Sequence, residues 1–375
     1  IAFGTLFPPE KRGKAQGLLS MVWGISSLLG PLTGGLMVAN FPWPWIFWIN
    51  LPVGAVATAM IFATFPRHAA PHRPHVIDWG GASLLVVGLT ALMLALMATE
   101  PLFMLGYPVG LVALGVFVMR QLRSPDPLVP LSPFRNRLFA VSTALGFGTT
   151  LTMFAALNYM PLFVQGAMDR TAPEAGLVLT PMMVAWPVAS AAAGWVLNRV
   201  GFRKIVVLGA MFMAAGYALL AWPAFKDSLW LLAAQAALLG AGMGLLTSTT
   251  LVAAQVSVPP RQIGTASSTL SLCRNIGGAI GLNMLGAMQL WVFNQRLSED
   301  GKALSEEQLT MLENPQMVLE HAGSLDPAVW QAFSSALGQS LHAIFGLSLM
   351  IALLVLAAAW IMPGLTPKQA AEQAQ

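Results

Sequence analysis

Long apolar runs, each close to the length that crosses a lipid bilayer as a helix, recur from one end of this sequence to the other. A bilayer core takes about 20 residues of helix. Only 9% of the residues are charged, against about 25% in ordinary soluble domains, so a soluble fold would lack the surface that it needs. The sequence therefore predicts an all-α polytopic membrane protein with about ten transmembrane helices, at about 15–39, 46–65, 79–99, 103–120, 138–162, 174–197, 204–222, 229–256, 265–293 and 338–362.

The charged residues of the connecting loops divide between the two sides of the membrane. Loops on the side of residue 10 hold 14 Lys and Arg residues against four acids, and the opposite loops hold four against eleven. The positive-inside rule places the first set in the cytoplasm, so the net charge of +4 reports topology and gives no support for nucleic-acid binding. We expect a multi-pass protein of the cell inner (plasma) membrane with both ends of this sequence in the cytoplasm.

A stripe of small residues crosses the first run. Ser26, Gly30 and Gly34 fall four residues apart, beside Pro31 and Gly35. On a helix the first three lie on one face, where the backbone of another helix can approach closely, and Pro31 bends the helix there. The stripe is either a general packing face or a dedicated seal between helices.

Part of this run occurs twice, at a fixed offset of 251 residues without gaps. Nine of the 28 positions from 8 to 35 are identical in the second copy. Both copies start in a loop of the same side and enter the membrane in the same direction, as parallel repeats do. Matching pairs include Ala15 with Ala266, Leu19 with Leu270 and Gly30 with Gly281.

Several strings together resemble the fourteen-span drug:proton antiporters of the major facilitator superfamily (EmrB/QacA type). Gly30-Pro31-x-x-Gly34-Gly35 resembles the antiporter motif of that family's fifth span. Residues 45–54 resemble the start of its sixth span, and residues 274–281 resemble its thirteenth. The resemblance covers nearly the whole sequence and implies the major facilitator fold.

The same resemblance implies a division of the chain. Residues 1–66 would be a remnant of the N-terminal six-helix half (the end of span 4 and spans 5–6), 79–120 two additional inserted helices, 136–362 the C-terminal six-helix half, and 363–375 a cytoplasmic tail. On this mapping we expect the sequence to be N-terminally truncated, with ten of fourteen spans present. The family's proton-binding acid would lie in the absent spans.

A second short string resembles the superfamily's cytoplasmic Gly-x-Leu-x-Asp-Arg-x-Gly-Arg loop. Its members here are Gly194, Asn198, Arg199, Gly201 and Arg203, with Asn198 where the family pattern has Asp. The missing charge leaves two interpretations open. The string is either a gating loop or a short basic loop that anchors the orientation in the membrane.

Arg274 is the one charge that the sequence places deep in a span, because it lies about ten residues from the start of its run. It is either a structural arginine satisfied by helix carbonyls and by Asn275, or a functional one that balances an acid or meets anionic substrate groups. The hydroxyl residues 247–250 precede it in the neighbouring run. They either line a polar cavity or bond to the backbone of their own helix.

The family resemblance implies a secondary active transporter that exports amphipathic or hydrophobic drug-like compounds by proton antiport and alternating access. Its partners would be membrane lipid, a small-molecule substrate, protons and, in a double-membrane bacterium, a periplasmic adaptor. The alternatives are a dedicated exporter of one metabolite, such as a siderophore or an antibiotic, and a membrane-embedded enzyme.

An enzyme needs convergent acids, histidines or a nucleophile, and the sequence shows no such set, so we expect no catalytic, cofactor or metal site. His68, His72 and His75 have near-helical spacing, but prolines interrupt any helix there. His342 lies one turn into the last run. Residues 294–337 are expected to form a long acidic loop on the outer side.

Overall fold

The computed structural model is helical in every element that it describes. It describes residues 11, 15, 17–19, 21–22, 26, 33, 37, 40–42, 44–64, 78–96, 105–124, 127–129, 131–222, 228–300, 312, 318 and 326–373. The helices are α3 (Trp45–Trp48), α4 (Asn50–Thr64), α5 (Trp79–Leu96), α7 (Gly106–Arg123), α8 (Arg137–Leu162), α9 (Ala172–Val200), α10 (Phe202–Ala221), α11 (Leu229–Val256), α12 (Ile263–Asp300), α15 (Pro327–Ile361) and α16 (Pro367–Gln373). Three short turns, η1 (Ser132–Arg135), η2 (Phe163–Ala167) and η4 (Pro260–Gln262), join them.

Seven helices in the described residues are long and apolar enough to cross a membrane. They begin at residues 45, 137, 172, 202, 229, 260 and 327 and coincide with seven of the ten predicted spans. A shorter apolar helix, Trp79–Ala95, and α7 lie where two further spans were predicted. Most of the predicted span at 15–39 lies outside the described residues. The all-α membrane fold is thus confirmed.

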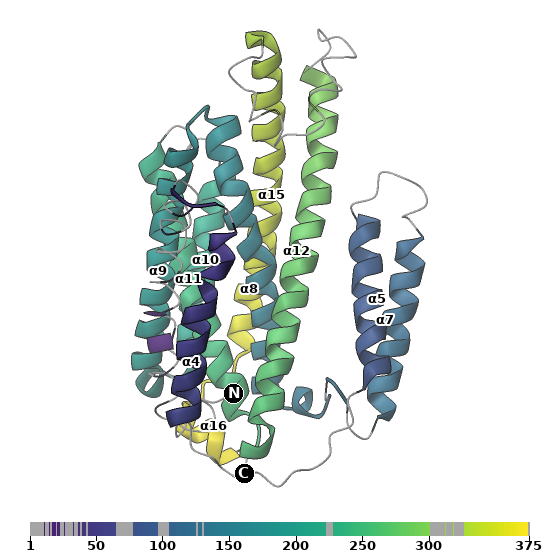
Figure 1. The fold of residues 1–375 in the computed structure, drawn as a ribbon, viewed down its shortest axis with the longest axis vertical. Helices are drawn as coiled ribbons and strands as arrows, with labels where there is room; N and C mark the ends of the chain where they lie inside the picture. The colour runs from purple at the N-terminus through teal and green to yellow at the C-terminus, as the bar shows by residue number, and fades with distance from the viewer. Residues whose placement is uncertain are drawn as a thin grey trace.

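The core of the bundle is made by α8, α9, α10, α11, α12 and α15, which pack side by side (Figure 1). Close approach depends on small residues, as expected where lipid removes the hydrophobic drive between helices. On α11, a Cβ atom at Gly240 would lie 2.9 Å from the Cα of Met182 on α9, and one at Gly244 would lie 2.9 Å from the backbone nitrogen of Ser190. Aromatic side chains such as Phe139 and Tyr217 fill the remaining space and are fully buried.

Helices α5 and α7 form a hairpin that stands beside this bundle (Figure 1). Small residues again set the contact, since a Cβ atom at Gly88 would lie 2.8 Å from the Leu114 side chain. Apart from their contact with each other, α5 and α7 touch the bundle mainly where α5 meets α12. Their outward side chains, Val86, Leu111 and Val112 among them, are more than half exposed, as lipid-facing residues are.

The prediction of a loop over 294–337 was wrong at both ends. Helix α12 continues to Asp300, and α15 begins at Pro327. At 1.5 Å per residue, the 38 residues of α12 span about 57 Å, well beyond a core of about 30 Å. The extensions are stabilised by packing on each other, because the rings of Phe293 and Phe333 meet at 5.7 Å and both side chains are fully buried. The acidic composition of this stretch predicted a loop, although its apolar residues are enough to pack the two helix extensions together.

Candidate functional site

The site is built where α12 packs on α8. A Cβ atom at Gly277 would lie 2.6 Å from the carbonyl oxygen of Phe147, and one at Gly281 would lie 2.8 Å from the Cα of Leu151. Both glycines are buried. Any side chain at these two positions would push the helices apart, so they fix how close α12 lies to α8 and where the preceding turn of α12 points.

Arg274 lies on that preceding turn of α12. Its Nη2 atom donates hydrogen bonds to the carbonyl oxygen of Thr247 and to the Oγ1 of Thr250 on α11, both at 2.6 Å. A glycine of α8 makes room for it, since a Cβ atom at Gly146 would lie 3.1 Å from Arg274 Nε. The guanidinium group is therefore held against α11 at the junction of three helices.

The hydroxyl groups of 247–250 extend this contact to a fourth helix. Trp186 of α9 donates from Nε1 to the Oγ1 of Thr247 at 3.2 Å. Thr247 and Thr250 also donate to carbonyl oxygens one turn back on their own helix, each at 2.7 Å. The interpretation that these hydroxyls bond to the backbone of their own helix is therefore confirmed for Thr247, Ser248 and Thr250, and Thr250 also receives Arg274. That they line a polar cavity stays a prediction.

The charge of Arg274 has no carboxylate opposite it within the described ranges. The salt bridges there join Asp78 to Arg120 and Arg170 to Glu174. The Nε atom of Arg274 is buried and has no hydrogen-bond partner among the described residues. A cation in an apolar bundle is costly unless it is paired. This arrangement can accept an anionic group, either from a substrate or from another segment of the protein.

The string from Gly194 to Arg203 forms the turn between α9 and α10. Gly201 ends α9 with φ of 80°, a conformation that favours glycine. The segment after α15 closes over this turn: the backbone N–H of Phe202 donates to the carbonyl of Leu365 at 3.0 Å, and Arg203 Nε donates to that of Met362 at 2.6 Å. Gly194 is buried, and Asn198 and Arg199 are exposed. The turn thus belongs to one end of the bundle, apart from the Arg274 network.

The small-residue stripe is described only in part. Ser26 is exposed, and Gly30, Pro31, Gly34 and Gly35 lie outside the described residues. Nearer the start of the same run, a Cβ atom at Gly17 would lie 2.8 Å from the Cα of Ala191 on α9. The sealing role of the stripe stays a prediction.

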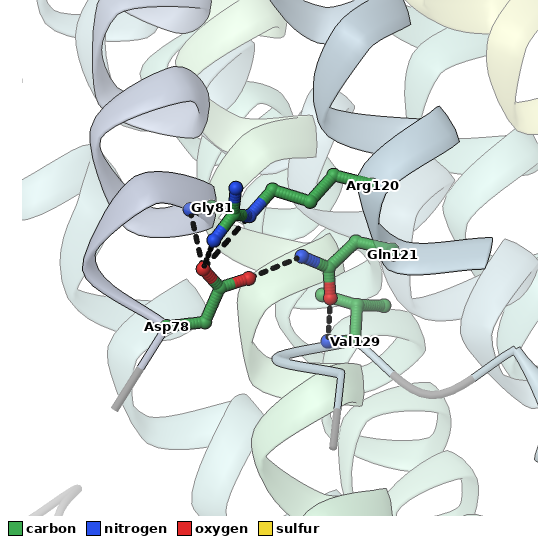
Figure 2. A network of polar contacts seen from close by, with 5 residues as sticks. All are labelled: Asp78, Gly81, Arg120, Gln121 and Val129. Atoms are coloured by element: carbon green, nitrogen blue, oxygen red, sulfur yellow. Dashed lines mark hydrogen bonds and ion pairs between the residues drawn. The ribbon is translucent and has the colours of Figure 1, made fainter. Parts of the chain in front are cut away.

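A polar network at one end of the α5–α7 hairpin was not predicted from the sequence (Figure 2). The Oδ1 atom of Asp78 accepts from Gly81 N at 2.9 Å and pairs with Arg120 at 2.7 Å. Its Oδ2 atom accepts from Gln121 Nε2, and the side-chain Oε1 of Gln121 accepts from Val129 N at 3.2 Å. The hydrogen bond from Arg120, more than the one from Gly81, holds the pKa of Asp78 below its ordinary value. The network ties both helices of the hairpin to the chain that leads to α8.

Comparison with known proteins decides the family. The family model described as Major Facilitator Superfamily matches residues 1–282. The chain belongs to the major facilitator superfamily. A solved structure of a bacterial homologue of the human lysosomal transporter Spinster, inward-facing and occupied, has the same fold at a TM-score of 0.54. It is 16% identical in sequence, and the match covers 96% of this chain and 71% of that one.

Proteins with similar sequences include two named as transporters and one named for multidrug resistance. Multidrug transporter protein MdtP of Bacillus subtilis (strain 168) is 30% identical, over 92% of this chain and 69% of its own length. Multidrug resistance protein 3 of the same organism is 33% identical, over 78% of this chain and 59% of its own. A transporter of the acurin A biosynthesis cluster of Aspergillus aculeatus is 28% identical, over 76% and 54%. These findings identify a membrane transporter rather than an enzyme.

Proposed function

We propose that this protein exports amphipathic or hydrophobic drug-like compounds by proton antiport and alternating access, as a member of the fourteen-span drug:proton antiporters. The names of two relatives, a multidrug transporter and a multidrug resistance protein, support the substrate class. The observation that carries the proposal is Arg274, a cation inside the bundle whose Nε has no partner in the described residues. Charges kept inside a membrane at such cost commonly mark substrate and ion pathways.

In this proposal Arg274 takes part in proton coupling. An ionised acid on another segment would pair with the guanidinium, and its protonation would break that pair. While the acid is protonated, the hydrogen bonds to Thr247 and Thr250 would keep the Arg274 side chain in the same position. Proton uptake would then bias the bundle between two arrangements, as alternating access requires.

Replacement of Arg274 tests this role. We expect Arg274→Ala to abolish energy-dependent efflux of ethidium from cells while the amount of protein in the membrane stays near normal. Arg274→Lys should restore only part of the efflux, because the planar fork that reaches Thr247 and Thr250 is lost. Arg296→Ala, near the far end of the same helix, is the matched control and should export normally. Normal efflux by Arg274→Ala would refute the proposal.

A dedicated exporter of one metabolite is the second candidate. It is favoured by one relative's name, which places a transporter of this superfamily in a biosynthesis cluster. Competition of ethidium efflux by unrelated apolar cations and neutral dyes separates the two. Inhibition by several chemical classes supports a broad exporter, and inhibition by none of them supports a dedicated one.

The proposed orientation places the α9–α10 turn and α16 in the cytoplasm, in a cell inner membrane. The excess of Lys and Arg in the loops of that side supports it. Reporter fusions after Arg67, Arg123 or Lys368 should read cytoplasmic, and a fusion near Glu307 should read periplasmic or extracellular. The reverse pattern at two of these sites would overturn the orientation. A periplasmic adaptor, proposed for a double-membrane bacterium, would dock on the side of Glu307.

A further inference from the structure

A cavity of about 440 Å³ lies between the end of α8 and the first half of α15. Helix α8 ends there in the wide turn η2, and Met168 and Arg170 follow it. This is the end of the bundle opposite α16 (Figure 1), which the proposed orientation makes the outer one. The volume falls in the range of about 300–1,000 Å³ that small-molecule pockets occupy. Nothing in the Arg274 network contributes to this cavity.

The wall of the cavity combines a cation, hydrogen-bonding groups and an apolar floor. Arg170 provides the charge, and Gln331, Gln339 and His342 from α15 provide polar groups. Phe163 and Met168 provide apolar surface. None of the described residues in the lining carries a carboxylate. Such a wall suits a molecule with one negative group on an apolar body.

The charge of Arg170 is available to a ligand. Among the described residues, the carboxylate oxygen that pairs with it is Glu174 Oε1, 4.0 Å from its Nη1, and the Arg170 side chain is 47% exposed. The other oxygen of Glu174 is occupied by Thr171, whose backbone N–H and hydroxyl donate to it at 2.8 and 2.9 Å. Glu174 therefore serves mainly as the cap of α9. A closer anion would compete with it successfully, since a hydrogen-bonded carboxylate lies within about 3 Å.

The walls are held in place by contacts of their own. The backbone N–H of Arg170 donates to the carbonyl of Val164 at 3.1 Å, which closes the turn η2. The ring of Phe163 lies edge-on to His342 at 5.3 Å and to Phe345 at 5.9 Å. His342 Nδ1 is 2.7 Å from the carbonyl oxygen of Gly338, which requires Nδ1 to donate. A pocket formed in advance loses little entropy when a ligand enters.

We propose that this pocket binds an amphipathic organic anion, with its carboxylate, phosphate or sulfonate on Arg170 and its apolar body on Phe163 and Met168. The anion can come from two sources, a solute or the headgroup of an anionic phospholipid at the membrane surface. The inference does not rest on export or on proton coupling. It concerns a site at the end of α8, and binding to it needs no gradient.

The test uses the purified protein in phosphatidylcholine nanodiscs with dansylglycine, a carboxylate on an apolar fluorophore. We expect saturable binding that Arg170→Gln weakens about tenfold or more, because one charge-assisted contact is lost. Arg296→Gln, the same change on the same proposed side but outside the cavity, is the control and should bind as the unmodified protein does. The neutral amide of dansylglycine should bind as weakly to the unmodified protein as dansylglycine does to Arg170→Gln.

The source of the anion is separated by adding phosphatidylglycerol to the nanodiscs. Displacement of dansylglycine by this lipid, abolished by Arg170→Gln, assigns the pocket to a lipid headgroup. Unchanged dansylglycine binding assigns it to a solute. Equal binding by Arg170→Gln and the unmodified protein, or equal binding of the acid and its amide, would overturn the proposal. Thermal unfolding of each variant shows whether it is folded, and Arg170→Lys, which keeps the charge, should recover part of the affinity if the anion contact is real.

Discussion

The two copies of the internal repeat have similar sequences and different surroundings. Leu19 of the first copy is 38% exposed, whereas Leu270, its counterpart, is fully buried. Ser26 is exposed, and Gly277 at the same place in the second copy is buried against the backbone of Phe147. At the first turn the two copies agree, since Ala15 and Ala266 are both buried.

This difference shows that neighbours, rather than the repeat's own residues, decide what a membrane helix buries. The second copy lies in α12, between α8, α11 and α15. In the first copy, Gly17 meets Ala191 of α9, and the following Leu18, Leu19 and Val22 are exposed. A face of small and apolar residues is equally stable in lipid and in a helix contact. The sequence of a copy therefore predicts that its helix can pack closely, but it does not predict which helices lie against it.

The largest effect is expected from adding a side chain to a glycine of the second copy, which is packed between other helices. Gly281→Leu would place a side chain where a Cβ atom already lies 2.8 Å from the Cα of Leu151. The neighbouring atom belongs to the backbone and cannot move aside as the end of a side chain can. Helices α12 and α8 should therefore separate, so that both the efflux and the amount of protein in the membrane decrease. Gly346→Leu on α15 is the control, since no atom lies within 4 Å of its Cβ position. Normal levels of Gly281→Leu would show that the close contact is dispensable.

The matching change in the first copy should have a narrower effect. We expect Gly30→Leu to abolish efflux while the protein still inserts and reaches normal levels, because Leu favours insertion and Leu18, Leu19 and Val22 of this copy are exposed. Efflux and membrane level are measured in the same cells. Loss of both, as for Gly281→Leu, would show that the two copies have the same role in assembly.

The sequence located most of the helices, missed the end of α12 and the start of α15, and was insufficient for the contacts between helices. Apolar runs located α8 to α11 within a few residues, because membrane helices are defined by length and apolarity. The sequence singled out Arg274 and offered helix carbonyls and Asn275 as its partners, and the structure provides one such carbonyl, that of Thr247, together with the hydroxyl of Thr250. The sequence did not indicate which helix would provide that carbonyl, because every residue of every helix carries one.

Contacts between residues that are far apart in the sequence could not be predicted either. Asp78 and Arg120 are 42 residues apart, and only the folded hairpin brings them together. The Asp before Trp79 and two glycines is a recognisable start signal for a helix. That signal fails to indicate a charge partner. The contact of Arg203 with Met362, across 159 residues, was hidden for the same reason.

A smaller effect is expected from a substitution at the residue that contacts the start of the second copy. Asn136 caps α8 by accepting from Leu138 N at 2.9 Å, and its Nδ2 donates to the carbonyl of Ser257, just before η4, at 2.9 Å. Asn136→Ala should destabilise the protein by about 1–2 kcal/mol, seen as a lower midpoint of thermal unfolding. Asn158→Ala is the control, because that amide is exposed and bonds only within its own helix. Equal midpoints for the two variants would argue against this tie between α8 and the second copy.

The smallest effect is expected from the hairpin that separates the two copies along the chain. The pKa of Asp78 is lowered by Arg120 from its ordinary 3.8, so the stabilisation is fully present above pH 3.8 and is lost as the pH falls through the lowered pKa. Asp78→Asn should lower the unfolding midpoint by only about 1–2 °C, since the Arg120 side chain is 52% exposed and the solvent screens the pair. That difference should be the same at pH 7 and pH 5 and should shrink below pH 4. Arg120→Gln should cause a similar loss, and the double variant should lose little more than either single one. Additive losses would show that the two residues act independently, and the hairpin would then be held by its apolar contacts alone.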